Sequence, residues 1–300
     1  MLQTFDERNR DLIVNVAGRL THRDEAAVSP FDSVVQGGDA VWEGLRLYNG
    51  RIFSLDAHLA RLRRSATALA FTTIPDDDAI TAEIARTLAA NSMTDGVHIR
   101  LTLTRGVKLT SGMDPRLNQA GPTLIVLAEH KAPVYDAAAG IRLVTASIRR
   151  PGPDVLDPKI HHNNLLTSIL AKIEANVAGA DDAVMLDSRG FVAETNATHL
   201  FLVTAGHLGT PTAAACPEGI TRETVLELAA DAGVTCREGD YSLTELYNAD
   251  ELFVTGTMGG IAPVTSLDGR VIGSGSPGPV TATLTDLLTK LTATTGTEVT

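Results

Sequence analysis

The chain has 300 residues, 44% of them hydrophobic and 20% charged, which is the balance of a folded globular protein and not of a disordered one. Acidic residues outnumber basic ones by 36 to 25, and the resulting formal charge of −11 argues against nucleic acid or an anionic membrane surface as a partner. The first residues carry charges of both signs and no run of about 18 apolar residues occurs, so we expect a cytoplasmic protein without a membrane segment.

The first part of the chain is expected to form a small α/β domain. Apolar residues recur at helical spacing over 54–71 and 75–91, and the second segment opens with a proline and aspartates, which suit a helix N-terminus. Residues 97–106 and 122–130 are rich in β-branched side chains and predict strands. Alanine, proline and glycine then interrupt both periodicities over 131–140, which predicts a linker.

The second part of the chain alternates strand-like and helical segments. We expect strands at 141–147, 251–257 and 261–273, helices at 163–180 and 219–233, shorter strands around the turn sequences DSRG and TAGH, a last helix from Pro279 and a frayed tail at 292–300. The chain therefore divides into a small α/β domain at 1–130, a linker at 131–140 and a larger domain at 141–300.

Cysteine and histidine usage indicates neither disulfides nor a metal. Cys216 and Cys236 are 20 residues apart and form no CxxC motif, so we expect two reduced thiols. The pair His161 and His162 is followed by no carboxylate at helical spacing, which makes it a weak signal for a metal site.

Lys159 and Glu194 are the two charged residues whose positions invite a chemical explanation. Lys159 follows Pro158 shortly before a predicted helix, and taken alone it is a solvated cation. Glu194 ends an apolar strand, where a carboxylate that faces the core needs a hydrogen-bonded cation as a partner. A protonated ring nitrogen would satisfy it.

Two further segments suit a phosphate group. Gly219, Ile220 and Thr221 stand at the start of a predicted helix, where free N–H groups and the positive end of the helix dipole attract anions. A second loop carries the hydroxyls of Thr255 and Thr257. A nucleophilic amine, a partner for a pyridinium and a phosphate cup together indicate pyridoxal 5′-phosphate as the cofactor.

Five sequence blocks, in order over about residues 10 to 280, carry a family resemblance. They read VWEGLRLYNGRIFSLDAHLARL, DPKIHHNNLL, FVAETNATHLFLV, EGITRETVLELA and FVTGTMGGIAPV. With them the chain resembles the class IV, or fold type IV, aminotransferases that depend on pyridoxal 5′-phosphate. That family includes branched-chain aminotransferases, D-amino-acid aminotransferases, (R)-amine transaminases and aminodeoxychorismate lyases.

The resemblance implies a fold, an assembly and a role for each matched residue. Lys159 would form the Schiff base with the cofactor and Glu194 would hold the pyridine nitrogen. Arg61 and the amides of Ile220 and Thr221 would bind the phosphate, beside the Thr257 hydroxyl. The fold would be α/β, with a small N-terminal domain and a larger pseudo-barrel domain that enclose the cofactor in a homodimer.

The resemblance implies transamination between an amino donor and a 2-oxo acid such as 2-oxoglutarate or pyruvate, but it leaves the donor open. Trp42 lies in a block typical of the branched-chain enzymes, whereas Asn164 stands where those enzymes have tyrosine, and Met258 departs from their loop. The segment LTLTRG resembles D-amino-acid and (R)-amine enzymes, so Arg105, and in second place Arg100, would bind a substrate carboxylate.

Two other activities fit parts of the sequence. An aminodeoxychorismate lyase would use the same lysine to release pyruvate. The segment GSGSPG at 273–278 matches the dinucleotide-binding pattern G-x-G-x-x-G, but only 22 residues follow it, too few for the rest of a βαβ unit. We therefore expect this segment to be a loop that leads into the last helix.

Overall fold

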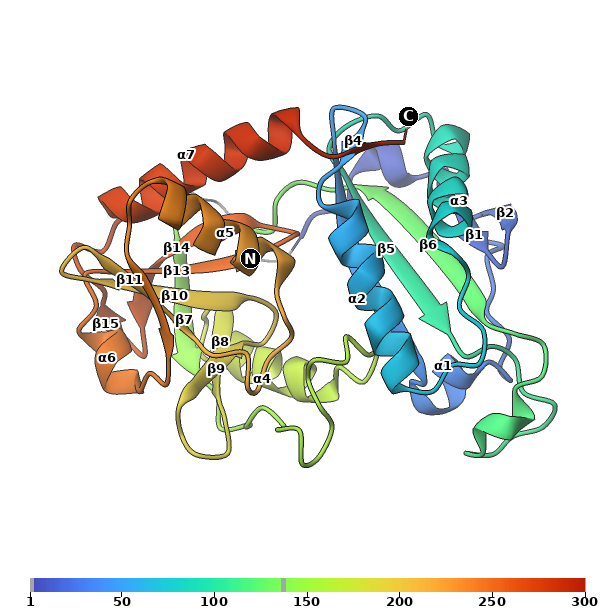
Figure 1. Ribbon diagram of the computed structural model, residues 1–300, viewed down its shortest axis with the longest axis horizontal. Coiled ribbons are helices and arrows are strands. Elements are labelled where there is room, and N and C mark those ends of the chain that lie inside the picture. The colour runs from blue at the N-terminus through green and yellow to red at the C-terminus, as the bar shows by residue number, and fades with distance from the viewer. Residues whose placement is uncertain (1–2, 136–138, 300) are drawn as a thin grey trace. The chain divides into compact units, whose positions relative to one another are not determined.

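The computed structural model describes residues 3–135 and 139–299, and within them the chain forms two compact units (Figure 1). The N-terminal unit comprises 3–132, 160–164 and 292–299, and the C-terminal unit comprises 133–159 and 165–291. The first division lies inside the predicted linker, of which residues 136–138 are outside the described residues. The predicted bounds need one correction, because 160–164 and 292–299 belong with the N-terminal unit and not with the larger domain.

The N-terminal unit is a seven-stranded antiparallel sheet in the order β16-β4-β3-β5-β6-β1-β2. Its elements are the short helices η1 (Glu7–Asn9), α1 (Ser33–Gly37) and η2 (Pro115–Leu117), the helices α2 (Leu55–Ala68) and α3 (Asp77–Ala90), and the strands β1 (Ile13–Val16), β2 (Arg19–His22), β3 (Ala40–Tyr48), β4 (Arg51–Ile52), β5 (Val97–Thr104), β6 (Thr123–His130) and β16 (Thr297–Glu298).

The two long helices of this unit form for the reasons that the sequence suggests. The apolar stripe of α2, which includes Leu55, Leu59 and Leu62, is buried in the core against β3. Asp76 caps α3 by accepting a hydrogen bond from the Ala79 N–H at 2.7 Å. The predicted helices at 54–71 and 75–91 and the predicted strands at 97–106 and 122–130 are therefore confirmed.

The C-terminal unit is built on a nine-stranded mixed sheet, in the order β12-β11-β10-β13-β14-β7-β8-β9 with β15 paired to β14. Its strands are β7 (Ile141–Thr145), β8 (Asp182–Leu186), β9 (Val192–Thr195), β10 (His199–Thr204), β11 (His207–Pro211), β12 (Cys236–Gly239), β13 (Glu251–Gly256), β14 (Gly260–Leu267) and β15 (Arg270–Val271). Its helices are α4 (Leu166–Val177), α5 (Ile220–Asp231), α6 (Leu243–Tyr247) and α7 (Pro279–Thr294).

Helices cover this sheet on both sides. Phe201 and Phe253 on β10 and β13 stack at 4.9 Å between ring centroids and pack with Leu284 and Leu288 of α7 and with apolar residues of α5. A separate cluster on the same strands packs with Leu246 of α6. In Figure 1, α5 and α7, coloured orange and red, lie together on one side of the strands of this unit.

The tail after α7 differs from its expected behaviour. Thr297 and Glu298 pair with Ile52 and Arg51 of β4, so the tail is a sheet strand and the expected fraying is wrong for the described residues. Other differences concern single elements. Helix α4 begins at Leu166 and not at 163, and no element was expected before residue 54, so the strands β1, β2, β3 and β4 and the helix α1 were missed, as were the short elements β12 and α6.

The glycine-rich segment 273–278 is a loop between β15 and α7, as expected. The N-terminus of α7 is occupied by the carboxylate of Glu251, which accepts the N–H groups of Val280 at 3.0 Å and Thr281 at 2.8 Å. A Cβ on Gly278 would lie 2.1 Å from the same carboxylate carbon. A protein carboxylate therefore holds the position that the pyrophosphate of a dinucleotide would need.

Candidate functional site

Lys159 lies in an exposed turn of the C-terminal unit, ahead of α4. Its backbone N–H donates to the carboxylate of Asp157 at 3.0 Å, and Pro158 before it is buried. The turn is thus fixed by its backbone, whereas the Lys159 side chain is on the surface of the unit. This geometry suits a lysine that acts on a ligand and does not support the core.

Glu194 is a buried carboxylate on β9 that faces a cation from another part of the unit. Oε1 of Glu194 is 2.5 Å from Nη2 of Arg150, and both side chains are nearly buried. Arg150 is fixed in turn by the hydroxyl of Ser168 on α4, which accepts from Nη1 at 3.0 Å. Glu194 therefore has the paired environment that a buried carboxylate requires, and Arg150 was not anticipated.

Several charged residues affect the pKa of the buried thiol of Cys216. Burial raises the pKa of the Cys216 thiol, and the nearby charge of Glu194 raises it further. The positive charges of Arg222, Arg150 and Lys159 act in the opposite direction. Lys159 and Glu194 thus act with opposite sign on the pKa of one buried thiol.

The start of α5 has the features of an anion site. Gly219 is its N-cap, with no side chain to accept a hydrogen bond from the first-turn N–H groups, and Ile220 and Thr221 form the first turn half-buried. On β13 the fully buried hydroxyl of Thr255 has no hydrogen-bond partner among the described residues. An uncapped helix start and an unpaired buried hydroxyl fit a phosphate group.

Two predicted residues lie in the turn between β13 and β14. Thr257 and Met258 are half-buried there, and the Met258 carbonyl accepts from the N–H of Val134 at 3.4 Å. A Cβ on Gly259 would lie 2.7 Å from the ring of Tyr135. The glycine that follows Met258 is therefore required by the close approach of this ring.

Arg61 is held in a buried ionic cluster of the N-terminal unit. Its Nε and Nη2 donate to the two oxygens of Glu43 at 2.8 and 2.6 Å, and Glu43 is 0% exposed. The same carboxylate lies 2.7 Å from Nδ1 of His58 and 3.4 Å from Nδ1 of His161. Burial alone would raise the pKa of Glu43, but His161 and the Arg61 guanidinium hold it well below its usual range. The predicted phosphate contact of Arg61 stays a prediction.

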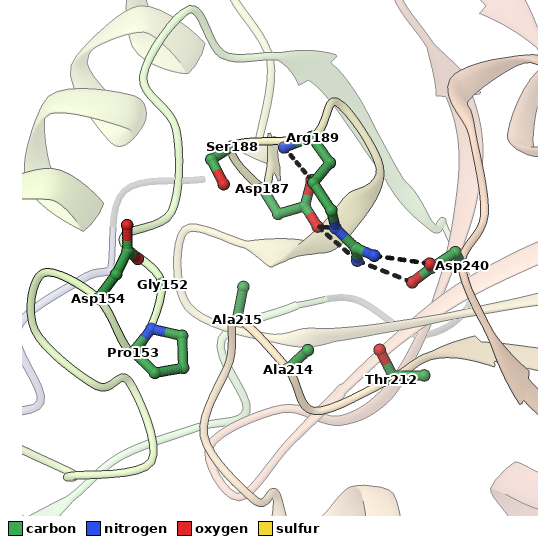
Figure 2. A pocket seen from close by; sticks show the side chains of 10 residues that line it. All are labelled: Gly152, Pro153, Asp154, Asp187, Ser188, Arg189, Thr212, Ala214, Ala215 and Asp240. Atoms are coloured by element: carbon green, nitrogen blue, oxygen red, sulfur yellow. Dashed lines mark hydrogen bonds and ion pairs between the residues drawn. The ribbon is translucent and has the colours of Figure 1, made fainter.

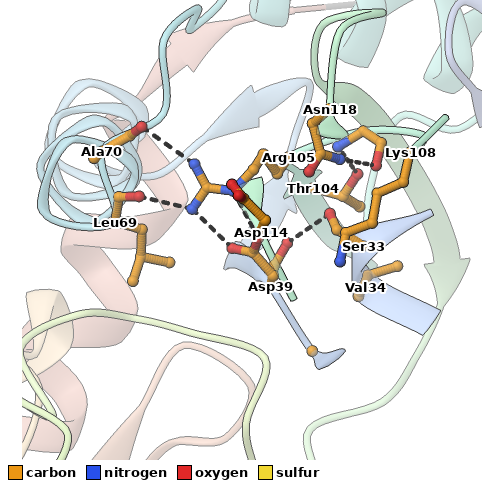
Figure 3. A network of polar contacts seen from close by, with 12 residues as sticks. Ser33, Val34, Asp39, Leu69, Ala70, Thr104, Arg105, Lys108, Asp114 and Asn118 are labelled. Carbon is orange, nitrogen blue, oxygen red and sulfur yellow. Dashed lines mark hydrogen bonds and ion pairs between the residues drawn. The ribbon is translucent and has the colours of Figure 1, made fainter. Parts of the chain in front are cut away.

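Arg105 is engaged by groups of its own unit (Figure 3). Its Nε and Nη2 donate to Asp39 at 2.6 and 3.1 Å, and Nη2 and Nη1 donate to the carbonyls of Leu69 and Ala70 at 2.7 and 3.2 Å. The guanidinium also lies 4.5 Å from the centroid of the Phe71 ring. These contacts use most of the N–H donors of Arg105. Two of them go to backbone carbonyls just after the C-terminus of α2 and so cap that helix.

Arg100, Trp42 and Asn164 lie on or near β3 and β5. The Arg100 guanidinium lies 3.4 Å from the Trp42 ring centroid and donates to the amide oxygen of Asn163 at 3.1 Å. Burial lowers the pKa of Arg100 to about 10, so it remains a cation at neutral pH. The Trp42 ring stacks on His161 at 4.3 Å, and the Asn164 amide donates to the carbonyl of Gly38 at 3.2 Å.

A cavity of about 390 Å³ opens elsewhere in the C-terminal unit (Figure 2). It is lined by Gly152, Pro153, Asp154, Asp187, Ser188, Arg189, Thr212, Ala214, Ala215 and Asp240. Its one guanidinium, from Arg189, lies between the carboxylates of Asp187 and Asp240, at 2.8 and 2.9 Å. The predicted site residues do not line this cavity, and its cation is already neutralised.

Neither a metal centre nor a membrane span is found in the described part of the chain. Among residues 3–135 and 139–299, no three histidine, cysteine or acidic side chains gather in a way that could hold a metal ion. None of the described helices combines the length and apolar composition that crossing a membrane needs. Cys216 and Cys236 are both free thiols.

Several residues of the site neighbourhood were not expected from the sequence. Arg150 and His199 lie around Glu194, and Glu43 and His58 lie around Arg61. The one available signal was the position of Glu43 and His58 within the same block as Arg61. Nothing in the spacing of Arg150 or His199 predicted that they flank Glu194.

Comparisons with known proteins agree on one family. The family model described as amino-transferase class IV matches residues 40–267. Branched-chain-amino-acid aminotransferase-like protein 2 of Arabidopsis thaliana is 55% identical over 284 residues, which cover 95% of this chain and 51% of that protein. The chain thus spans about half the length of this relative.

Other relatives match along nearly their whole length. The D-alanine aminotransferase of Bacillus licheniformis is 34% identical over 270 residues, which cover 88% of this chain and 91% of that protein. Among solved structures, the branched-chain amino acid aminotransferase of T.th. complexed with N-(5′-phosphopyridoxyl)-L-glutamate has a TM-score of 0.88 and 30% identity over 94% of both chains. Both chains therefore share one fold.

Proposed function

Because the chain belongs to the class IV aminotransferases, we propose that it binds pyridoxal 5′-phosphate through Lys159 and transfers an amino group from a donor to a 2-oxo acid. The observation that carries the proposal is the class IV match over residues 40–267 together with the buried Glu194 carboxylate, which is paired with Arg150 on the C-terminal unit. The complex of the T.th. relative contains a phosphopyridoxyl group, which supports the choice of cofactor.

The proposed site residues of the C-terminal unit each contribute one chemical feature. Glu194, paired with Arg150, would accept a hydrogen bond from the ring N–H of the cofactor and so hold the proton on that nitrogen. The uncapped start of α5 and the hydroxyls of Thr255 and Thr257 hold the phosphate. When bound, the cofactor withdraws electrons from the substrate carbon. Lys159 removes the proton from that carbon and returns it as an acid.

A panel of donors and acceptors tests the proposal. The protein is expected to transfer the amino group of L-leucine, D-alanine, D-glutamate or (R)-1-phenylethylamine to 2-oxoglutarate or pyruvate. The relatives bear branched-chain and D-alanine names, so the panel includes both donor classes. Release of pyruvate without amino transfer would instead favour the aminodeoxychorismate lyase reaction, and absence of cofactor binding would refute both.

The substrate carboxylate is best assigned to Arg100. Its contacts with Asn163 and the Trp42 ring are with uncharged groups, whereas Arg105 is already paired with Asp39. Arg100→Ala is expected to lower kcat/KM for amino acid donors by roughly ten- to a hundredfold and to spare an uncharged amine, because only the former lose a charge-assisted pair.

Arg105→Ala is the matched comparison in the same assay. Since the Arg105 guanidinium closes the end of α2, this variant should lower the melting temperature and affect all donors alike. Selective loss of carboxylated donors in Arg105→Ala, and not in Arg100→Ala, would reverse the assignment and restore Arg105 as the carboxylate ligand.

We also propose that the protein is a cytoplasmic homodimer, with α4 in the interface. Its residues Leu166, Ile169, Leu170, Ile173 and Val177 form an exposed apolar stripe at spacings of three and four residues. A second copy of the chain presents the same stripe, which makes a two-fold symmetric contact self-complementary.

Ile169→Lys combined with Ile173→Lys is expected to convert the dimer to a monomer, because each copy would bring two lysines into the interface and four like charges would be buried there. Sedimentation velocity measures the change. Ala282→Lys on the exposed face of α7 adds a cation in the same unit and should leave the mass unchanged. A dimer that persists in the double variant would exclude α4 from the interface.

A further inference from the structure

The imidazole of His199 fills the space in which a side chain at position 219 would lie. A Cβ placed on Gly219 would be 2.2 Å from Nε2 and 2.3 Å from Cδ2 of His199, and contacts below 3.0 Å are essentially never found. The backbone at Gly219 does not require glycine, since its φ is −78°. The contact with His199 is therefore the reason for glycine at the entrance of α5.

The opposite edge of the same ring faces Glu194. Nδ1 of His199 is 3.9 Å from Oε2 of Glu194, while Arg150 holds the other oxygen at 2.5 Å. His199 is 9% exposed, so the ring is enclosed. One rigid side chain thus separates the carboxylate from the helix start.

Both ends of this contact have little freedom to move. His199 is on β10, directly opposite Thr255 of β13, in the middle of the sheet. Arg222, whose Cβ would be 3.1 Å from a Cβ on Gly219, fixes the first turn of α5 through the carbonyl of Pro211 at 2.9 Å. A larger residue at 219 would therefore have to displace either the helix or the ring.

We propose that His199 is a positioning residue that sets the separation between the Glu194 carboxylate and the N-terminus of α5. Gly219, which has no side chain, leaves the space that the His199 ring occupies. The proposal rests on the proposed function, in which these two features bind opposite ends of one pyridine phosphate. Such a ligand gains both contacts only if their separation equals its own length.

A size-complementation experiment tests the proposal with two ligands, pyridoxal 5′-phosphate and pyridoxal, which lacks the phosphate. Gly219→Ala is expected to raise the dissociation constant of the phosphorylated ligand at least tenfold and that of pyridoxal much less. His199→Asn in the same chain should recover most of the loss, because the smaller side chain frees the space for the added methyl group. Absorbance titration gives each constant.

The control is Gly239→Ala in the same unit, where an added Cβ meets no atom closer than 3.7 Å and binding should not change. His199→Asn alone should weaken pyridoxal 5′-phosphate more than pyridoxal and keep the melting temperature, so it tests the inference if Gly219→Ala fails to fold, and equal weakening of the two ligands would overturn it. Equal binding by wild type and Gly219→Ala, or no recovery in the double variant, overturns the inference. Loss of ligand binding in the wild type instead overturns the proposed function.

Discussion

Lys159→Ala is expected to abolish amino transfer, with a loss of at least about a thousandfold in kcat, while the protein stays folded. The loss is large because, in the proposed function, one amine both carries the cofactor and moves the proton. The fold is spared because the Lys159 side chain is exposed and its only described hydrogen bond, from the backbone to Asp157, does not involve the amine. Steady-state kinetics and circular dichroism measure the two effects.

Borohydride reduction followed by peptide mapping identifies the lysine directly. The label is expected on Lys159 in the wild-type protein. Lys172 is the matched control, because its amine lies 3.3 Å from Asp182 in the same unit and Lys172→Ala should retain turnover. A label on Lys172 or on Lys108 would show that another residue carries the cofactor.

Glu43→Gln is expected to lower the free energy of unfolding by roughly 3–5 kcal/mol at pH 7. Glu43 is fully buried between the Arg61 guanidinium and the rings of His58 and His161, so loss of its charge leaves a buried cation without an anion. Urea denaturation of both proteins measures the difference. The surface carboxylate Glu298, paired with Arg51 on the same sheet, provides the control, and Glu298→Gln should change little.

The contribution of Glu43 should depend on pH with a defined sign. Its pKa in the folded protein is well below the ordinary value of 4.5, so the unfolded chain binds the proton more readily. The stabilisation is therefore complete above about pH 5 and is lost as the pH falls through the folded pKa. The difference in the free energy of unfolding between wild type and Glu43→Gln should therefore become smaller as the pH falls. If that difference in the free energy of unfolding did not depend on pH, the charge of Glu43 would contribute nothing to stability.

Local patterns were sufficient to predict the parts of the molecule that depend on neighbouring residues in sequence. The helix with Leu55, Leu59 and Leu62 follows from the spacing of its apolar residues, and the start of the last helix follows from Pro279. The family resemblance selected Lys159 and Glu194, and their roles stay predictions.

Pairings between distant residues could not be predicted in the same way. Arg150 and Glu194 are 44 residues apart, and their contact depends on how β9 and the loop after β7 meet in the sheet. The pairing of Arg105 with Asp39, 66 residues away, could likewise not be predicted from a single sequence, and binding of substrate by Arg105 stays a prediction. The tail was expected to fray because a two-residue strand such as Thr297–Glu298 has no periodicity to detect.

The pairing of Thr297 with Ile52 also affects how the N-terminal unit can fold while the chain is being synthesised. The sheet of the N-terminal unit takes its edge strand from residues that are synthesised about 245 positions after β4. The other strands of the unit leave the ribosome before β16, so the unit cannot complete its hydrogen bonding until β16 has followed, unlike a domain whose strands are all contiguous. Nascent chains that stop before residue 297 should therefore expose the unpaired edge of β4, where another chain can add a strand.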